Sequence, residues 1–188
     1  SYRARPGHRR SCTREHSVGA ILAEQAELTD GRSSMQIHTT RFGTVDVPAD
    51  ELVTFEDGLP GFPGPRSMAL LGAGDMPGGV PGVGHHSLYW LQDTEDPDVA
   101  FLTIVPWSAY PDYDIDIDVA GSDPDDLCVL AIVTVRREDG AVKLTANLLA
   151  PVVIDSRTKR GHQAILHDQD WPIHAPLAEA QQSTIKAG

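Results

Sequence analysis

The chain has 188 residues, 40% of them apolar, and a formal net charge of −12 at pH 7. This length suffices for one compact domain, and no run of about 18 apolar residues is present to span a membrane. Residues 1–34 hold six arginines and four carboxylates, which leaves 9 basic and 23 acidic residues in 35–188, a net charge of −14. A body this acidic argues against direct nucleic-acid binding, and it suits either a basic protein partner or solubility alone.

Three regions differ in composition. Residues 1–34 mix Arg, Ser and Gly, and we expect a basic N-terminal extension that is poorly ordered or not native to the domain. Regular patterning begins at Met35, so the folded domain is predicted over 35–175, followed by a C-terminal tail over 176–188. The two cysteines occupy unlike settings, which predicts no disulfide and is typical of a reducing cytoplasm.

Short apolar runs separated by Gly, Pro and acidic turns predict about ten strands and almost no helix. The expected strands cover residues 36–40 and 44–47 as a hairpin, 52–55, 67–71, 87–92, 99–105, 114–119, 127–135, 142–149 with a continuation to 154, and 162–166. Residues 122–126 contain a capping residue and a proline, which predicts a short helical turn. This pattern indicates an all-β fold, either an antiparallel sandwich or a small closed barrel.

Loops separate these strands. Residues 56–65 form a Gly- and Pro-rich loop that we expect to be rigid, whereas the glycine-rich loop 72–84 is expected to be mobile. The strand at 114–119 alternates Asp with Ile or Val, which predicts that Ile115, Ile117 and Val119 are buried and that carboxylates share the opposite face.

No catalytic or metal-binding pattern is visible. The chain lacks a Gly-x-Ser-x-Gly elbow and a phosphate-binding glycine loop with its lysine. His85, His86, His162 and His167 have no zinc-ligand spacing, and the aspartates at 112–118 lack the glycine turn of a calcium loop. We therefore predict no catalytic residue, no metal and no cofactor, which favours a binding protein over an enzyme.

Several motifs, taken together and in order over about residues 35–175, resemble the FliW family of flagellar assembly factors. The motifs are RFG at 41–43, FEDGLPGF at 55–62, YWLQ at 89–92, DP at 96–97, AF at 100–101, YPDY at 110–113, AIVTV at 131–135, TANLLAPVVI at 145–154 and QAIL at 163–166. The extension before Met35 and the glycine-rich loop lie outside that pattern.

The resemblance implies a small antiparallel β-barrel-like domain with few short helical turns, acting as a monomer in the bacterial cytoplasm. Proteins of this family bind the basic translational repressor CsrA and relieve its block on flagellin mRNA. They also bind flagellin, so that free flagellin releases CsrA in a partner exchange. Two alternatives stay open: a flagellin-dedicated assembly chaperone without a translational role, and a barrel enzyme or small-ligand carrier.

Three stretches are the candidates for partner contacts. In the rigid loop, Phe62 with Pro60 either plugs the core or contacts a partner. The acidic turn, defined here as residues 93–98, is expected to present carboxylates to a basic partner. Asn147 is a polar amide in an apolar run, and if it is buried it must be hydrogen-bonded. The candidate contact residues are Pro60, Phe62, Glu95, Asp96, Asp98 and Asn147.

Overall fold

The computed structural model describes residues 33–73, 88–115, 117, 119, 121–138, 141–167 and 169–177. The predicted all-β fold is confirmed, since these residues are mostly strand and contain no helix of 7 or more residues. The strands are β1 Ser34–Thr39, β2 Gly43–Pro48, β3 Val53–Phe55, β4 Gly58–Leu59, β5 Phe62–Pro63, β6 Arg66–Gly72, β7 Leu88–Asp93, β8 Ala100–Ile104, β9 Leu127–Glu138, β10 Ala141–Ala146, β11 Val152–Asp155, β12 Arg160–Gln163 and β13 Ala175–Pro176. Three short 3-10 turns accompany them: Ala49–Glu51, Pro106–Ser108 and Pro124–Asp126.

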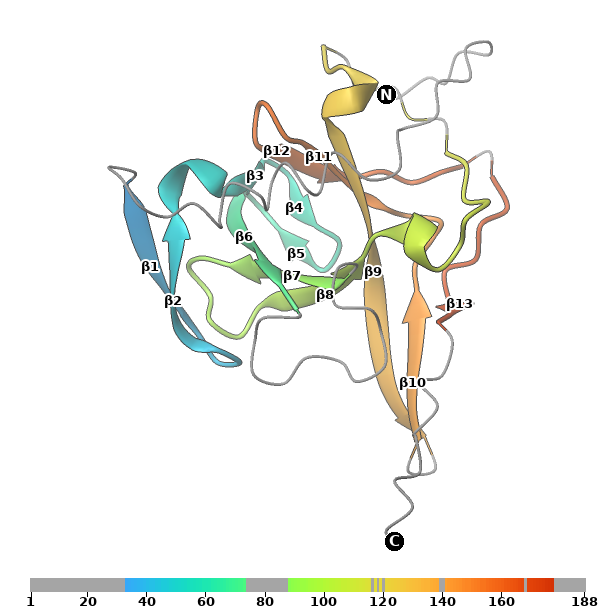
Figure 1. Ribbon diagram of the computed structural model, residues 1–188, viewed down its shortest axis with the longest axis horizontal. Coiled ribbons are helices and arrows are strands. Elements are labelled where there is room, and N and C mark those ends of the chain that lie inside the picture. Colours follow the sequence, from blue (N-terminus) through green and yellow to red (C-terminus); the bar gives the residue numbers. More distant parts are fainter. Residues whose placement is uncertain are drawn as a thin grey trace, which may run out of the picture.

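Seven strands close into a barrel (Figure 1). They follow the order β11-β12-β3-β6-β7-β8-β9, and β9 pairs back with β11 to complete the ring. Neighbouring strands are antiparallel except β12 and β3, which are parallel and meet at Arg160 and Thr54. Strands β10 and β13 continue the sheet outward from β9, while β1–β2 and β4–β5 are separate hairpins. Closure removes most of the unpaired edges that an open sheet would expose.

The barrel interior is filled by one face of the strands. Because side chains alternate along a strand, every second residue of each strand points inward. Strands β3, β6, β7, β9 and β11 all contribute to this interior, and the β4–β5 hairpin adds Leu59. The buried interior residues are Val53, Phe55, Leu59, Met68, Leu70, Tyr89, Leu91, Cys128, Leu130, Val152 and Ile154.

Phe55 and Gly161 meet inside the barrel where β12 passes β3. The Phe55 side chain is fully buried, and a Cβ placed on Gly161 would lie 2.5 Å from its ring. No real side chain tolerates that distance, so a glycine at this position lets the ring fill the space between the two strands. The interior is thus packed around this aromatic ring.

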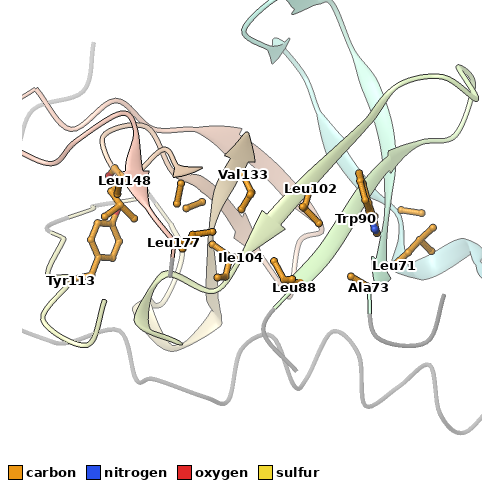
Figure 2. Packing of buried hydrophobic residues seen from close by; sticks show 14 of the residues in the cluster. Leu71, Ala73, Leu88, Trp90, Leu102, Ile104, Tyr113, Val133, Leu148 and Leu177 are labelled. Atoms are coloured by element: carbon orange, nitrogen blue, oxygen red, sulfur yellow. Dashed lines mark hydrogen bonds between the residues drawn. The ribbon is translucent and has the colours of Figure 1, made fainter. Parts of the chain in front are cut away.

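A second apolar cluster covers the outer face of β6 to β9 (Figure 2). Leu71, Trp90, Ile104 and Val133 point out of the barrel, and the β1–β2 hairpin and the C-terminal segments cover them. Tyr113 joins this cluster and donates its hydroxyl hydrogen bond to the carbonyl of Leu148 at 2.7 Å. Burial on both faces accounts for the nearly continuous apolar runs of β8 and the first half of β9.

The strand predicted at 114–119 is wrong. At the described positions 114, 115, 117 and 119 the chain is irregular, although Ile115 and Ile117 are partly buried against the outer cluster. None of the described strands pairs with this segment. The alternating sequence therefore packs its apolar residues without joining a ladder. Asp116 and Asp118 lie outside the described residues.

Other predictions fare differently. The helical turn after Ser122 is confirmed, since Asp123 caps Pro124–Asp126 by accepting a hydrogen bond from the backbone N–H of Asp125. The strands predicted at 127–135 and 142–149 pair with each other as β9 and β10 of an antiparallel hairpin, with residues 139–140 outside the described part. Residues 1–32, 74–87 and 178–188 also lie outside it, so the predicted extension, most of the glycine-rich loop and most of the tail are not described.

Candidate partner-binding surface

The acidic turn connects β7 to β8 and is built on Asp93. This carboxylate is 2% exposed, and its Oδ1 accepts hydrogen bonds from the backbone N–H groups of Glu95 at 2.8 Å and Asp96 at 3.0 Å. Its Oδ2 forms a salt bridge with Nη1 of Arg66. An aspartate that binds N–H groups two and three residues ahead fixes a tight local turn. The buried Asp93 therefore sets the conformation of the exposed residues that follow it.

The side chain of Gln92 also contacts the backbone of this turn. Its side chain is completely buried, and Nε2 lies within hydrogen-bond distance of the carbonyl oxygens of Asp93 at 3.0 Å, Asp96 at 3.3 Å and Val99 at 3.0 Å. These carbonyls come from the first residue of the turn, from its middle and from the residue that follows it. A buried amide within hydrogen-bond distance of all three carbonyl oxygens connects the turn to the barrel strand that carries Gln92.

The β1–β2 hairpin binds the turn from the side. Thr40 donates its backbone N–H to the carbonyl of Pro97 at 3.0 Å and its hydroxyl to Oδ1 of Asp98 at 2.5 Å. The backbone N–H of Asp98 in turn donates to Oδ1 of Asp96 at 3.1 Å. Among the described residues, the Glu95 carboxylate has no hydrogen-bond or ion-pair partner. The three predicted carboxylates therefore lie together, exposed, on an ordered loop.

Phe62 lies at the rim of the barrel, where Arg66 connects it to Asp93. Its half-buried ring packs edge-on against Phe101 with the centroids 5.2 Å apart, and the Arg66 guanidinium lies 5.5 Å from the ring centroid. Arg66 also forms the salt bridge to Asp93, so one side chain touches both the aromatic pair and the base of the acidic turn. Pro60 is exposed at the tip of the same hairpin. Two candidates chosen separately from the sequence thus belong to one surface.

Asn147 is separate from this surface. It lies in the bend between β10 and β11, where Oδ1 accepts a hydrogen bond from the backbone N–H of Ala150 at 3.0 Å. Its own backbone N–H donates to the carbonyl of Ile132 at 2.9 Å. The side chain is half-buried and shapes the bend ahead of Pro151, which favours a structural role within the fold.

Sequence reasoning missed the residues that organise the surface. The sequence placed Asp93 at the start of the acidic turn but did not single it out, although an aspartate at that position is itself a turn signal. Gln92, the residue before it, was not considered as part of this surface. Thr40 and Arg66 gave no such signal, because they reach the turn from sequence separations of 58 and 27 residues.

A pocket of about 550 Å³ lies on another side of the barrel, beside β3, β11 and β12. Burial by itself raises the pKa of the Asp155 carboxyl in this pocket. Hydrogen bonds from the Ser122 hydroxyl and the backbone N–H groups of Thr158 and Arg157 outweigh that effect, so the pKa lies below its ordinary value. Asp155 thus anchors the turn after β11, and its oxygens are engaged in structural hydrogen bonds.

His162 in the same pocket predicts a pH dependence of stability. Burial lowers the pKa of its imidazole below the ordinary value of 6.5. The unfolded chain then binds a proton more readily than the native state, so the free energy of unfolding should decrease as the pH falls below about 6.5. Urea midpoints at about pH 7.5 and about pH 5.5 test this, with His162→Gln as the comparison. A variant that loses as much stability between these pH values as the wild type would contradict the assignment.

Two further searches cover the described residues alone. No group of three or more His, Cys, Asp or Glu side chains there is placed to hold a metal ion. No helix in that part of the chain has the length and apolar character needed to cross a membrane.

The geometry describes a small closed β-barrel domain with an ordered acidic turn at its surface. A family model described as FliW protein matches residues 36–177. The flagellar assembly factor FliW of Treponema denticola is 33% identical over 152 residues, which cover 77% of this chain and 95% of the relative. The protein of the same name from Thermoanaerobacter pseudethanolicus is 32% identical over 153 residues, covering 77% and 94%.

A solved structure agrees with these relatives. The crystal structure of the flagellar assembly factor FliW superposes with a TM-score of 0.61 at 27% sequence identity, covering 78% of this chain and 99% of that chain. The chain belongs to the FliW family of flagellar assembly factors. The members of this family are assembly factors, and the family is not a known class of enzyme.

Proposed function

We propose that this protein is a cytoplasmic regulatory binding protein without catalytic activity, which binds and antagonises the translational repressor CsrA and thereby relieves repression of flagellin synthesis. Flagellin is its second partner and competes in an exchange that releases CsrA. The observation that carries the proposal is the acidic turn, whose exposed carboxylates are held in place by Asp93, Gln92 and Thr40.

An ordered turn favours binding for an entropic reason. Side chains and loops that become immobile only on association cost binding free energy, whereas a loop already fixed by buried groups does not. Glu95, Asp96 and Asp98 project from such a loop on a protein of net charge −12. A basic partner such as CsrA would be steered to this place by long-range attraction and oriented there by the local carboxylates.

The aromatic pair next to the turn supplies the apolar part of the proposed interface. Phe62 and Phe101 are both half-buried, so their remaining exposed surface is available to a partner. Interfaces draw much of their binding energy from aromatic residues surrounded by polar groups. Arg66 joins the pair to Asp93 and keeps the two parts of the surface in a constant arrangement.

The decisive experiment is a titration of the purified chain with CsrA and with flagellin by calorimetry, followed by addition of flagellin to the complex with CsrA. We expect both to bind a monomer of this chain and flagellin to displace CsrA. Binding of flagellin alone would favour the alternative, a flagellin-dedicated assembly chaperone without a translational role. Binding of neither would overturn both functions and leave only the shared fold.

The carboxylates of the turn yield a sharper prediction. Replacing Glu95, Asp96 and Asp98 by their amides should slow association with CsrA about tenfold at low salt and flatten its salt dependence. The dissociation rate should change less, because rim charges act mainly on encounter. Association rates measured by stopped-flow fluorescence at several salt concentrations test this.

A matched variant distinguishes the effect of the turn carboxylates on the association rate from the effect of the net charge. Asp46, Asp50 and Asp112 are exposed on β2, in the 3-10 turn Ala49–Glu51 and in the loop after Ser108, and their replacement by Asn removes the same total charge. If this variant slows association as much as the turn variant, net charge alone acts and the turn is not the binding surface.

A further inference from the structure

Strands β9 and β10 extend beyond the barrel as a two-stranded arm, defined here as residues 135–138 and 141–144 (Figure 1). β9 is 12 residues long, but only its first part pairs with β8 and β11. The remainder pairs with β10 alone, from Leu144 opposite Val135 to Ala141 opposite Glu138. The arm is therefore not required to close the ring, and its features call for a separate explanation.

One face of the arm carries exposed apolar side chains next to Arg137. Val135 is 49% exposed and Val142 is 47% exposed, two of the few large apolar side chains exposed to that degree in the described part of the chain. They share a face with Val133 and Ala146, which are buried in the outer cluster, because residues two apart point the same way. The outer cluster thus continues into solvent along the arm.

The arm is also basic, in contrast to the protein as a whole. Arg136 and Arg137 form no salt bridge among the described residues, although Lys143 and, to a smaller extent, the charge of Arg136 lower the pKa of Glu138. Arg137 lies directly opposite Val142 on the apolar face, and Arg136 lies opposite Lys143 on the other face. Glu138, the arm's described acidic residue, is bound by Lys143 at 2.7 Å. By comparison, each other described Lys or Arg has an ion pair or lies over an aromatic ring. These are Arg41, Arg66, Lys143, Arg157, Lys159 and Arg160.

Among the described residues, the outer edge of β10 has no partner strand beyond Leu144, toward the tip of the arm. β13 pairs only with Thr145 and Ala146, and the backbone N–H of Leu177 donates to the carbonyl of Leu144 at 2.9 Å. Alternate residues of an antiparallel strand direct their backbone groups to the same side, so the N–H and C=O of Val142 face this same edge. They have no backbone partner there within the described residues. An edge of this kind accepts an additional extended segment.

We propose that the arm binds an extended acidic segment of a protein partner by strand addition along β10. The segment's backbone pairs with Val142, its apolar side chains cover Val135 and Val142 on one face, and its carboxylates lie on the other face, on the side of Arg136. This inference is independent of the proposed function, because it uses basic residues of β9 and β10, whereas the acidic turn connects β7 to β8. It gives the protein a second binding surface selective for an acidic ligand.

The test uses two synthetic twelve-residue peptides that alternate Val and Thr with either Glu or Lys, added to the full chain labelled with nitrogen-15 at low salt. The Glu peptide should shift the backbone amides of the arm, with Val142 among the strongest, and the Lys peptide should not. Arg136→Glu combined with Arg137→Glu should weaken binding of the Glu peptide about tenfold. Arg157→Glu with Arg160→Glu, an equal charge change on another turn, should leave it unchanged.

Several outcomes would overturn the proposal. No shift in the arm, or equal binding of both peptides, would remove the arm as an acidic-segment site. Binding that appears only after the chain is truncated at Leu177 would show that residues 178–188 occupy the edge. Self-association that the arginine reversals abolish would assign the arm to a second copy of this chain. An RNA oligonucleotide that binds the arm more tightly than the Glu peptide would assign it to nucleic acid.

Discussion

Replacing Phe55 by alanine should lower the free energy of unfolding by about 3–5 kcal/mol. The ring is completely buried in the barrel interior and lies against Gly161, so no neighbouring side chain on β12 can move into the space it leaves. The loss combines the transfer free energy of the ring with the cost of the cavity that remains. Urea unfolding followed by tryptophan fluorescence measures it, with the same slope expected for both proteins.

Phe62→Ala is the matched control for this experiment. The same atoms are removed, but this ring is half-buried at the barrel rim, so its loss should cost clearly less than that of Phe55. Equal costs for the two variants would mean that the interior cluster does not carry the stability assigned to it here.

Replacing Asp93 by alanine should cost about 3 kcal/mol of stability, because it removes a buried carboxylate that binds Arg66 and two backbone N–H groups. Arg66 keeps some contact with solvent, which limits the penalty of leaving its charge unpaired. The same change should also weaken binding of CsrA, although Asp93 itself is buried, because the acidic turn loses its anchor. Denaturant unfolding and a calorimetric titration measure the two effects.

Asp93→Asn separates the two roles of this side chain. An asparagine oxygen can still accept the hydrogen bonds from Glu95 and Asp96, so the turn should persist while the salt bridge to Arg66 is lost. We therefore expect Asp93→Asn to lower the free energy of unfolding while its binding of CsrA stays nearly normal. If Asp93→Ala binds CsrA as well as the wild type, the ordered turn is not the basis of the interaction.

The strands illustrate what local patterning can predict. The apolar run at 127–135 and the alternating hairpin at 36–47 both formed strands where expected, because their periodicity matches the burial of one or both faces. The segment 114–119 has an equally regular alternation but joins no sheet at its described positions. Periodicity states which side chains prefer burial, and it does not state whether a partner strand is available.

The residues of the proposed binding surface also fall into those that the sequence could identify and those that it could not. Glu95, Asp96, Asp98 and Phe62 could be selected from the sequence because charge, turn residues and an apolar ring in a rigid loop are local features. That Arg66 joins them into one surface could not, since it depends on the register between β6 and β7. Asn147 was selected with them, and its hydrogen bonds place it in a different bend of the chain.

The all-β character, most strand positions, the acidic charge and, through the motifs, the family follow from local features of the chain. The pairing of β9 with β11 that closes the barrel, the parallel pairing of β12 with β3 and the projection of a basic arm from an acidic body emerge only in the folded molecule. The difference lies in the range of the interactions. Turns, caps and alternation act within a few residues, whereas closure and salt bridges such as Arg66 with Asp93 join segments that only the packed core brings together.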